Sequence, residues 1–288
     1  MFAFIKNHLR RNPTILKAYR SIQWKKHIYS DWLNTYLFKH TVQLDTPFGF
    51  KMMTRNYLAN RMMIEGAFET EETELIKKNL SDAEVFVDVG ANIGVYTSIA
   101  CSLGKHVIAI EPQPQNLECL YANLISNNWQ NAEVFPLGVS DQPGLVILYG
   151  ASGPSASLVS GWGGYSKRFQ RIIPVNTLDT LLGNRFSGKK LFIKIDVEGA
   201  EYHVMRGAIK TLSLSPRPTW LIEICLNEFH PGGTNPNYEA TFELFWQHGY
   251  EARMANKEVT RVTPNDIKSW VARNGSTNHT FNYLFIPK

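Results

Sequence analysis

The residues best suited to chemistry in this chain of 288 residues lie where short apolar runs end. Asp88, Gly90, Asn92 and Gly94 stand at the end of the apolar run 85–89, just before a helical pattern. Glycines in such a strand-to-helix turn allow a tight backbone and the close approach of a ligand. We therefore predict that these four residues bind a cofactor.

Two further positions complete the predicted cofactor site. Glu111 ends the second apolar run, where its carboxylate can accept hydrogen bonds from both hydroxyls of a ribose. Ser140 and Asp141 end the third strand, in a place where a hydroxyl or an acid can meet an adenine amino group. Ligands of doubly wound sheets bind at the carboxyl ends of the strands, so we expect these residues to share one crevice.

Two cofactors compete for such a site, a nicotinamide dinucleotide and S-adenosylmethionine. The dinucleotide fingerprint needs G-x-G-x-x-G, but Asn92 and Val95 occupy its second and third glycine positions. Asp88 before the turn also suits a cationic ligand better than a pyrophosphate. S-adenosylmethionine, which carries an amino group and a sulfonium but no phosphate, is therefore the predicted cofactor. An NAD(P)-dependent oxidoreductase is the alternative.

The predicted chemical site is the segment that ends the fourth strand. Methyl transfer from a sulfonium to an alcohol needs positioning and the removal of a proton. Asp196 and Glu198 are two positions apart, so in an extended segment they point to the same side. Asp196 is the leading general base, Glu198 is expected to bind the acceptor or shift the pKa of Asp196, and His230 is the secondary base. A divalent cation held by these three residues stays an open version, although the spacing does not demand a metal.

Nearby charged residues have simpler structural explanations. Glu201 is expected to favour the positive N-terminus of a helix, and His203 to lie on the surface of that helix. Lys194, in the middle of a strand, is expected to pair with a buried acid such as Glu223 on the neighbouring strand.

Apolar periodicity places these residues in an alternating order of strands and helices. Leu117, Leu120, Tyr121, Leu124 and Ile125 form one stripe of a predicted helix. The predicted strands are 85–89, 106–110, 133–137, 191–195 and 220–224, and a helix is predicted around 204–212. This alternation implies βαβ units and a parallel sheet that is covered on both faces.

The flanking segments are predicted to be different in kind. A hairpin is expected over 46–60, turning at 47–49, followed by a helix over 67–80 whose acidic start favours the macrodipole. The segments 251–255 and 282–286 are expected to pair as an antiparallel hairpin at the sheet edge, with no helix between them. The glycine- and serine-rich stretch 150–170 carries Trp162, Tyr165, Lys167 and Arg168, and we predict that it forms a lid.

The overall composition is that of a globular protein, with 44% hydrophobic and 19% charged residues. No apolar window is long enough for a transmembrane helix, and early charged residues interrupt the start of the chain, so a secretory signal is not expected. The three isolated cysteines are predicted to be buried thiols in a reducing compartment, and the expected location is cytoplasmic. Basic residues before Asp31 are interpreted as a solvated helix face, with an anionic surface as a candidate contact. No nucleic-acid motif accompanies them.

Three segments, in this order and spacing, are similar to the FkbM family of methyltransferases: VFVDVGANIGVYTSIA, VIAIEPQPQNLECLYANL and LFIKIDVEGAEYHVMRGA. Shorter matches are at 65–69, 175–179, 221–223 and 282–285, so the resemblance covers roughly residues 48–288. The DVEGAE segment is its most specific part, and the first 45 residues fall outside it.

The resemblance implies a Rossmann-like class I methyltransferase fold, an α/β fold with a seven-stranded, mostly parallel sheet and an antiparallel last strand. It also implies methyl transfer to a hydroxyl of a sugar, glycan or natural product. Carried over residue by residue, the first cofactor motif falls on Asp88, Gly90, Asn92 and Gly94, the ribose acid on Glu111, and the adenine contact on 140–141. The predicted regions are a basic, aromatic helical extension (1–45), a hairpin and helix (46–80) and the methyltransferase domain (81–288). A non-catalytic protein that binds S-adenosylmethionine is the other alternative, and the sequence leaves the oligomeric state open.

Overall fold

The computed structural model describes residues 41–55, 70–150, 156–164, 169–273, 275 and 280–288. All but the last five residues of the predicted N-terminal extension lie outside these ranges, as do residues 56–60 of the predicted hairpin and the first three of the predicted helix 67–80. Residues 151–155 and 165–168 of the predicted lid, which include Tyr165, Lys167 and Arg168, also lie outside them. No helix in the described ranges has the length and apolarity to span a bilayer.

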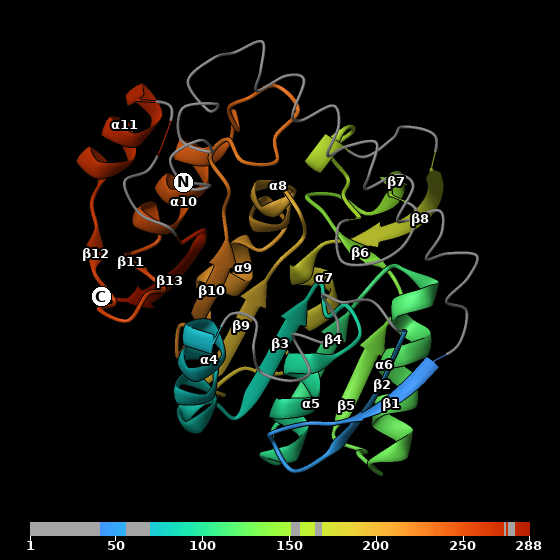
Figure 1. The fold of residues 1–288 in the computed structure, drawn as a ribbon. Helices are drawn as coiled ribbons and strands as arrows, with labels where there is room; N and C mark the ends of the chain where they lie inside the picture. The colour runs from blue at the N-terminus through green and yellow to red at the C-terminus, as the bar shows by residue number, and fades with distance from the viewer. Residues whose placement is uncertain (1–40, 56–69, 151–155, 165–168, 274, 276–279) are drawn as a thin grey trace, which may run out of the picture.

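The centre of the molecule is an eight-stranded sheet in the order β12-β11-β13-β10-β9-β3-β4-β5 (Figure 1). Its strands are β3 (Val85–Val89), β4 (His106–Ile110), β5 (Ala132–Phe135), β9 (Leu191–Ile195), β10 (Thr219–Glu223), β11 (Tyr250–Met254), β12 (Arg261–Val262) and β13 (Asn282–Pro287). Five neighbouring strands are parallel, namely β5, β4, β3, β9 and β10. β13 is antiparallel to both of its neighbours, β10 and β11. Apart from the two-residue edge strand β12, this is the predicted seven-stranded class I methyltransferase sheet with an antiparallel last strand.

The order of the parallel strands determines where a ligand can bind. Numbered along the chain, β5-β4-β3-β9-β10 is the order 3-2-1-4-5 of a doubly wound sheet. The order reverses between β3 and β9, and the crevice of such sheets lies at the carboxyl ends of the strands at this switch point. The central strands β3 and β9 are buried along their whole length, as expected of strands that are covered on both faces.

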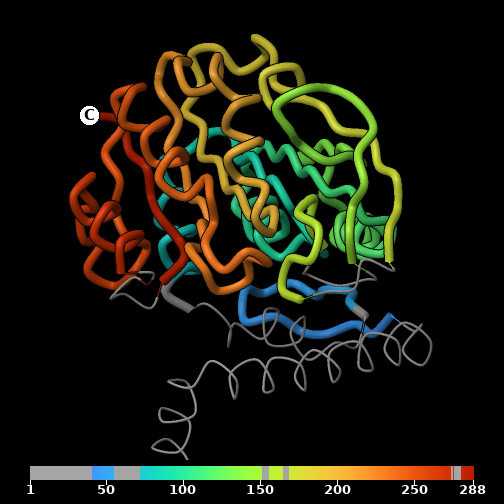
Figure 2. The backbone as a smooth tube through the Cα atoms, turned by 90° about the horizontal axis from the view of Figure 1, so that it is seen from above, coloured from blue at the N-terminus to red at the C-terminus, as the bar shows by residue number. Residues whose placement is uncertain are grey.

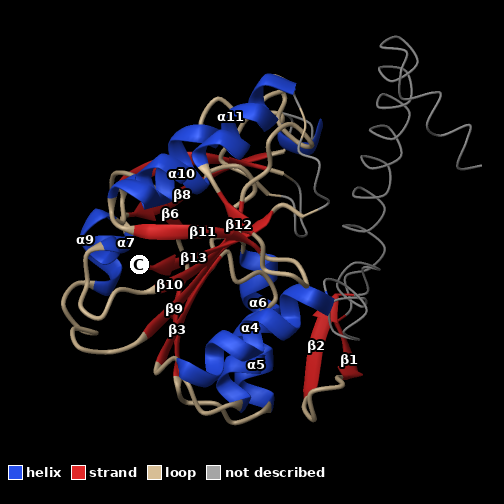
Figure 3. Ribbon diagram, turned by 90° about the vertical axis from the view of Figure 1, so that its left-hand side faces the viewer, coloured by secondary structure: helices blue, strands red, loops and turns tan. Residues whose placement is uncertain are grey.

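Helices cover both faces of the sheet, as Figure 3 shows. One layer consists of α4 (Thr70–Asp82), α5 (Val95–Ser102) and α6 (Pro114–Ser126). The other consists of α7 (Leu178–Leu182), α8 (Glu201–Arg206), α9 (Ile209–Leu212), α10 (Tyr238–Gln247) and α11 (Pro264–Arg273). Alternate residues of each strand pack into two separate cores: Phe86 packs against the first layer, whereas Val85 and Val87 pack against the second.

Two smaller sheets flank the central sheet. The hairpin of β1 (Thr41–Asp45) and β2 (Lys51–Arg55) lies along one side of the core (Figure 2). Its turn is confirmed, but its first strand comes before the predicted range of 46–60. Asn123 on α6 fastens it, because its side chain bonds both backbone groups of Met53 and donates to the Ile93 carbonyl at 2.9 Å. The other sheet has the order β6-β8-β7 and contains β6 (Gly138–Val139), β7 (Gly144–Tyr149) and β8 (Gln170–Asn176). A short 3-10 helix, η1 (Trp162–Gly164), lies in the excursion between β7 and β8.

Several details of the predicted fold are wrong. The closing segments do pair antiparallel as β11 and β13, but α11 lies between them in the chain, and β13 lies between β10 and β11 instead of at the sheet edge. The predicted helix around 204–212 is two short helices, α8 and α9, interrupted at Gly207. Within α6, Tyr121 and Ile125 are exposed, because Asn116 and Asn123 take the buried positions of the stripe and form hydrogen bonds there.

Candidate active site

The predicted cofactor turn between β3 and α5 has the backbone that its sequence requires. Gly90, Asn92 and Gly94 all have positive φ, at 84°, 52° and 85°, a region that glycine and asparagine tolerate best. A Cβ on Gly90 would lie 1.9 Å from the carbonyl oxygen of Asp196, and one on Gly94 would lie 2.3 Å from Leu120 Cδ1. The turn therefore packs directly against the segment that carries the predicted base.

Replacing Gly90 by alanine is expected to destabilise the fold by at least about 2 kcal/mol, the sum of left-handed strain and overpacking. Gly104→Ala is the matched control, because Gly104 has φ +72° but no atom lies within 4 Å of the place that its Cβ would occupy. Urea unfolding separates the two contributions, since the control suffers the strain alone. Equal losses in the two variants would contradict the close approach of Gly90 to Asp196.

Asp88 lies beneath this turn and is buried. It accepts a hydrogen bond of 2.6 Å from Thr97 Oγ1 on α5, and in the sheet register it stands beside Lys194. Burial raises the pKa of Asp88, and the Lys194 ammonium acts in the opposite direction. The carboxylate thus links β3 to α5 and lies beside the charge of Lys194 at the switch point.

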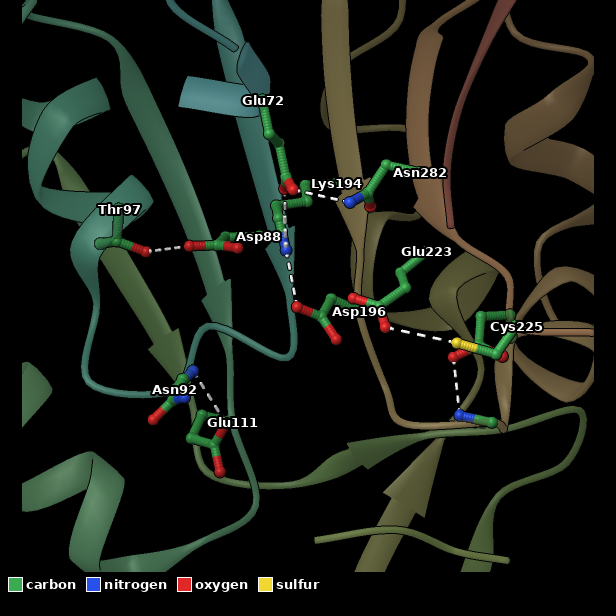
Figure 4. Close-up of polar contacts among 12 residues, drawn as sticks. Glu72, Asp88, Asn92, Thr97, Glu111, Lys194, Asp196, Glu223, Cys225 and Asn282 are labelled. Carbon is green, nitrogen blue, oxygen red and sulfur yellow. Dashed lines mark hydrogen bonds and ion pairs between the residues drawn. The ribbon is translucent and has the colours of Figure 1, made fainter. Parts of the chain in front are cut away.

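Glu111, at the end of β4, holds the same turn from the other side (Figure 4). Its Oε2 accepts from the backbone N–H of Asn92 at 2.9 Å, and its Oε1 accepts from Gln113 N at 2.8 Å and from Asn116 Nδ2 at 3.2 Å. A carboxylate offers about four acceptor positions, so one remains for a ribose hydroxyl in this arrangement. Burial raises the pKa of Glu111 to about 7, although these hydrogen bonds oppose the shift.

The turn also presents a buried acceptor that the described residues do not satisfy. The Oδ1 atom of Asn92 has no hydrogen-bond partner among them, although it is shielded from solvent. Buried polar atoms are normally paired, so a ligand that donates an amino or hydroxyl proton fits here. S-adenosylmethionine, with donor groups on its ribose and amino-acid part, fits this acceptor and the neighbouring carboxylates.

Ser140 and Asp141 do not end the third parallel strand as predicted. That strand, β5, ends at Phe135, and the two residues follow β6 of the small sheet. Asp141 Oδ2 lies 3.7 Å from both His203 Nδ1 and Arg206 Nη1 on α8. The surface position predicted for His203 is confirmed, because 45% of its side chain is exposed. The adenine contact of 140–141 stays a prediction.

Asp196 follows β9 and takes part in a buried ion-pair network (Figure 4). Lys194 Nζ lies 2.9 Å from Asp196 Oδ2 and 3.8 Å from Glu72 Oε1 on α4. The predicted pairing of Lys194 with a buried acid is confirmed, but the acid is Glu72 on α4 and not Glu223, and Asp196 is a second partner. Burial lowers the pKa of Lys194, but Asp196 and Glu72 more than offset this effect and hold it well above its usual value.

Glu198 lies in a turn and not in the extended segment that the prediction assumed. Its φ is +55°, and Gly199 follows with φ +96°. Trp162 Nε1 donates a hydrogen bond of 2.6 Å to Glu198 Oε2. Burial and the nearby Asp196 raise the pKa of Glu198 to about 8, whereas the Trp162 hydrogen bond lowers it. The two carboxylates are close enough to interact, but a turn brings them together.

Glu201 and His230 border this pair. Glu201 begins α8 as predicted and accepts a 2.8 Å hydrogen bond from Gly199 N, while burial raises its pKa to about 7. His230 lies in a loop with its ring perpendicular to the Trp162 ring, at a centroid distance of 6.3 Å, and its Nδ1 accepts from Gly232 N. Partial burial lowers the pKa of His230. His230 thus contacts the residue that holds Glu198, not the carboxylates themselves.

In the part of the chain that the structure describes, no three His, Cys, Asp or Glu side chains gather as a metal-binding group. Asp196, Glu198 and His230 therefore do not form the cluster that the metal-assisted version needs. The three cysteines are buried free thiols, as predicted.

Sequence reasoning misses two residues of this site. The sequence indicates Glu72 only as part of an acidic helix start, yet it is a partner of Lys194 and accepts from Asn282 Nδ2 at 2.7 Å. It indicates Trp162 only as an aromatic residue of the predicted lid. A buried lysine and a buried carboxylate each need a partner, but the sequence does not say which residue reaches them.

Comparison with known proteins identifies the family. The model of the methyltransferase FkbM domain matches residues 88–252, more than half of the chain. No curated protein matches. The similar solved structures include the precorrin-6y C5,15-methyltransferase of Geobacter metallireducens GS-15, with 15% identity, a TM-score of 0.38 and coverage of 74% of this chain and 86% of that one.

Two other solved structures are similar over part of their length. The tRNA (uracil-54, C5)-methyltransferase of Pyrococcus abyssi, in complex with S-adenosyl-L-homocysteine, has 11% identity and a TM-score of 0.36. The match covers 64% of this chain and 35% of that enzyme. The bifunctional kinase-methyltransferase WbdD has 13% identity and a TM-score of 0.40, with 79% and 39% coverage. This chain therefore spans well under half of either enzyme.

Proposed function

The chain belongs to the FkbM methyltransferase family, and we propose that it transfers the methyl group of S-adenosylmethionine to a hydroxyl of a sugar, glycan or related natural product. One observation carries the assignment of the chemical site. The backbone of Asp196 lies against Gly90 of the cofactor turn, so an acid at the end of β9 stands next to the predicted cofactor.

The side chains around Asp196 suit the removal of a proton from an alcohol. Lys194 occupies Oδ2 of Asp196, and Oδ1 takes no hydrogen bond from the described residues. The Lys194 ammonium, 2.9 Å from Oδ2, fixes the direction of the carboxylate and leaves Oδ1 for the proton of the acceptor. When bound, S-adenosylmethionine supplies a methyl group on a good leaving group.

Glu198 supports a hydroxyl acceptor in a different way. With its pKa near 8, it carries a proton for much of the time at neutral pH, so it can donate a hydrogen bond as well as accept one. Two neighbouring carboxyl groups whose environments differ in this way can divide the work. Asp196 takes the proton of the acceptor hydroxyl, and Glu198 orients the acceptor.

The proposal is tested by measuring release of S-adenosylhomocysteine from S-adenosylmethionine with a panel of methyl glycosides and nucleotide sugars. Transfer RNA and simple amines serve as comparison acceptors. We expect turnover with a sugar hydroxyl and a methyl ether in the product. Cofactor binding without turnover on any acceptor would favour the non-catalytic alternative, and turnover on RNA or amines alone would contradict the acceptor class.

Glu111→Ala is expected to weaken binding of S-adenosylhomocysteine by about 2 to 3 kcal/mol, the scale of a charge-assisted hydrogen bond. The variant loses the predicted ribose acceptor and the support of the Asn92 backbone. Isothermal titration measures the change, with NAD as a second ligand that should not bind either protein. Unchanged affinity in a folded variant would contradict this placement of the nucleoside.

A further inference from the structure

Trp162 donates a hydrogen bond to Glu198 but takes no part in the transfer of the methyl group or the proton. We propose that Trp162 is a positioning residue that fixes the Glu198 carboxyl group through its indole N–H, an inference that rests on the proposed function. Trp162 is only 2% exposed, although it belongs to an excursion between two strands of the small outer sheet. A large aromatic residue in a loop is buried to this extent only where the loop packs closely on its neighbours.

The backbone of the 198–199 turn is shaped to receive this ring. A Cβ on Gly199 would lie 2.4 to 2.9 Å from three atoms of the Trp162 ring, so a residue with a side chain does not fit there. Ser157, five residues before Trp162, donates from Oγ to the carbonyl oxygen of Glu198. The loop therefore holds Glu198 at its backbone and at its side chain.

A second loop holds the tryptophan from behind. Gly163 N donates to the Phe229 carbonyl at 2.8 Å, and the Phe229 ring lies 6.0 Å from the Trp162 ring. A Cβ on Gly161 would meet Pro231 Cβ at 3.3 Å. Because contacts on both sides restrain the indole, its N–H has a defined direction, which a positioning residue requires.

The charged groups around Glu198 explain why one hydrogen bond matters. Asp196 on the end of β9 and Glu201 on α8 both favour its neutral form, and Lys194 favours its charged form. Among the described residues, the Cys225 thiol also interacts with the charge of Glu198, and the His230 ring lies 6.3 Å from the Trp162 ring. The indole N–H donates to the charged form and so opposes burial. Its removal should therefore raise the pKa of Glu198.

The test is an NMR titration that needs no acceptor. In protein labelled with ¹⁵N-tryptophan, one of the seven indole resonances should shift with pH, with a midpoint near 8, and the shift should vanish in Glu198→Gln. In protein labelled with ¹³C at the glutamate carboxyl carbons, Trp162→Phe should raise the Glu198 midpoint by about one pH unit. Trp246→Phe, which alters a partly buried tryptophan on α10, should leave that midpoint unchanged.

Each outcome decides the proposal. An indole resonance that titrates only when Glu198 is present supports it, even if Trp162→Phe does not fold. If no indole resonance follows Glu198, or if its midpoint stays or falls in a folded Trp162→Phe, Trp162 is only a packing residue. The titration is independent of turnover, so a chain that releases no S-adenosylhomocysteine would contradict the proposed function without changing this result. Where turnover is found, Trp162→Phe should lower kcat and leave the KM for S-adenosylmethionine unchanged.

Discussion

Asp196→Asn is expected to lower kcat by roughly 10² to 10⁴-fold, the range for loss of a general base, while cofactor affinity stays the same. An amide cannot take the proton of the acceptor hydroxyl. Its oxygen can still accept the hydrogen bond from Lys194, so the fold should survive. The measurement is release of S-adenosylhomocysteine with an acceptor from the sugar panel, together with isothermal titration of the cofactor.

The control for Asp196→Asn is Glu133→Gln, which changes an acid on β5 that pairs with Arg185 and His106 at the surface. It should have no effect on kcat. Glu198→Gln is expected to reduce kcat less than Asp196→Asn, because Glu198 orients the acceptor. Full activity of a folded Asp196→Asn would assign the base elsewhere, with His230 the next residue to replace.

Lys194→Met is expected to destabilise the protein by about 3 to 5 kcal/mol, the cost of leaving buried charges without their partner. Lys194 is 3% exposed and contacts Asp196 and Glu72, and Asp88 stands beside it in the register. Urea unfolding of wild type and variant at pH 7 measures the difference. Lys189→Met, which breaks an exposed pair with Glu84, should cost no more than about 1 kcal/mol.

The loss of stability in Lys194→Met should depend on pH. Without the ammonium, the buried carboxyl groups have raised pKa values in the folded variant, so the folded state binds more protons than the unfolded state. The variant therefore gains stability as the pH falls, and its deficit relative to wild type should shrink between pH 7 and pH 5. Adding Glu72→Gln should also recover part of the loss. A deficit that is constant with pH would mean that Lys194 acts through packing alone.

The parallel part of the fold could be predicted because each central strand is a short apolar run. The bounds of β3, β4 and β9 match the prediction, since strands buried on both faces have continuous apolar sequences. The outer sheet has a weaker signal in the sequence. Its antiparallel pair, β7 and β8, exposes Ile147 and Ile172, so the alternation of apolar and polar residues does not distinguish these strands from loops.

The cofactor turn could be predicted from its glycines, whereas the interactions of the acids could not. Gly90 and Gly94 have the positive φ that their residue type suggests. The partner of Lys194, in contrast, is Glu72, 122 positions earlier in the chain. Such a pairing depends on how α4 packs on the sheet. The turn at Glu198 was unpredictable for a related reason, because glutamate rarely adopts a positive φ and the contacts of Ser157 and Trp162 hold it there.

The most direct test of the methyl-transfer site is a crystal structure of the protein with S-adenosylmethionine bound. The decisive quantity is the distance from the Asp196 carboxylate to the carbon of the sulfonium methyl group. We predict a distance within about 8 Å, so that an acceptor hydroxyl can touch both groups at once. A longer distance, with the cofactor bound at the Gly90–Gly94 turn, would contradict the assignment of Asp196 as the base.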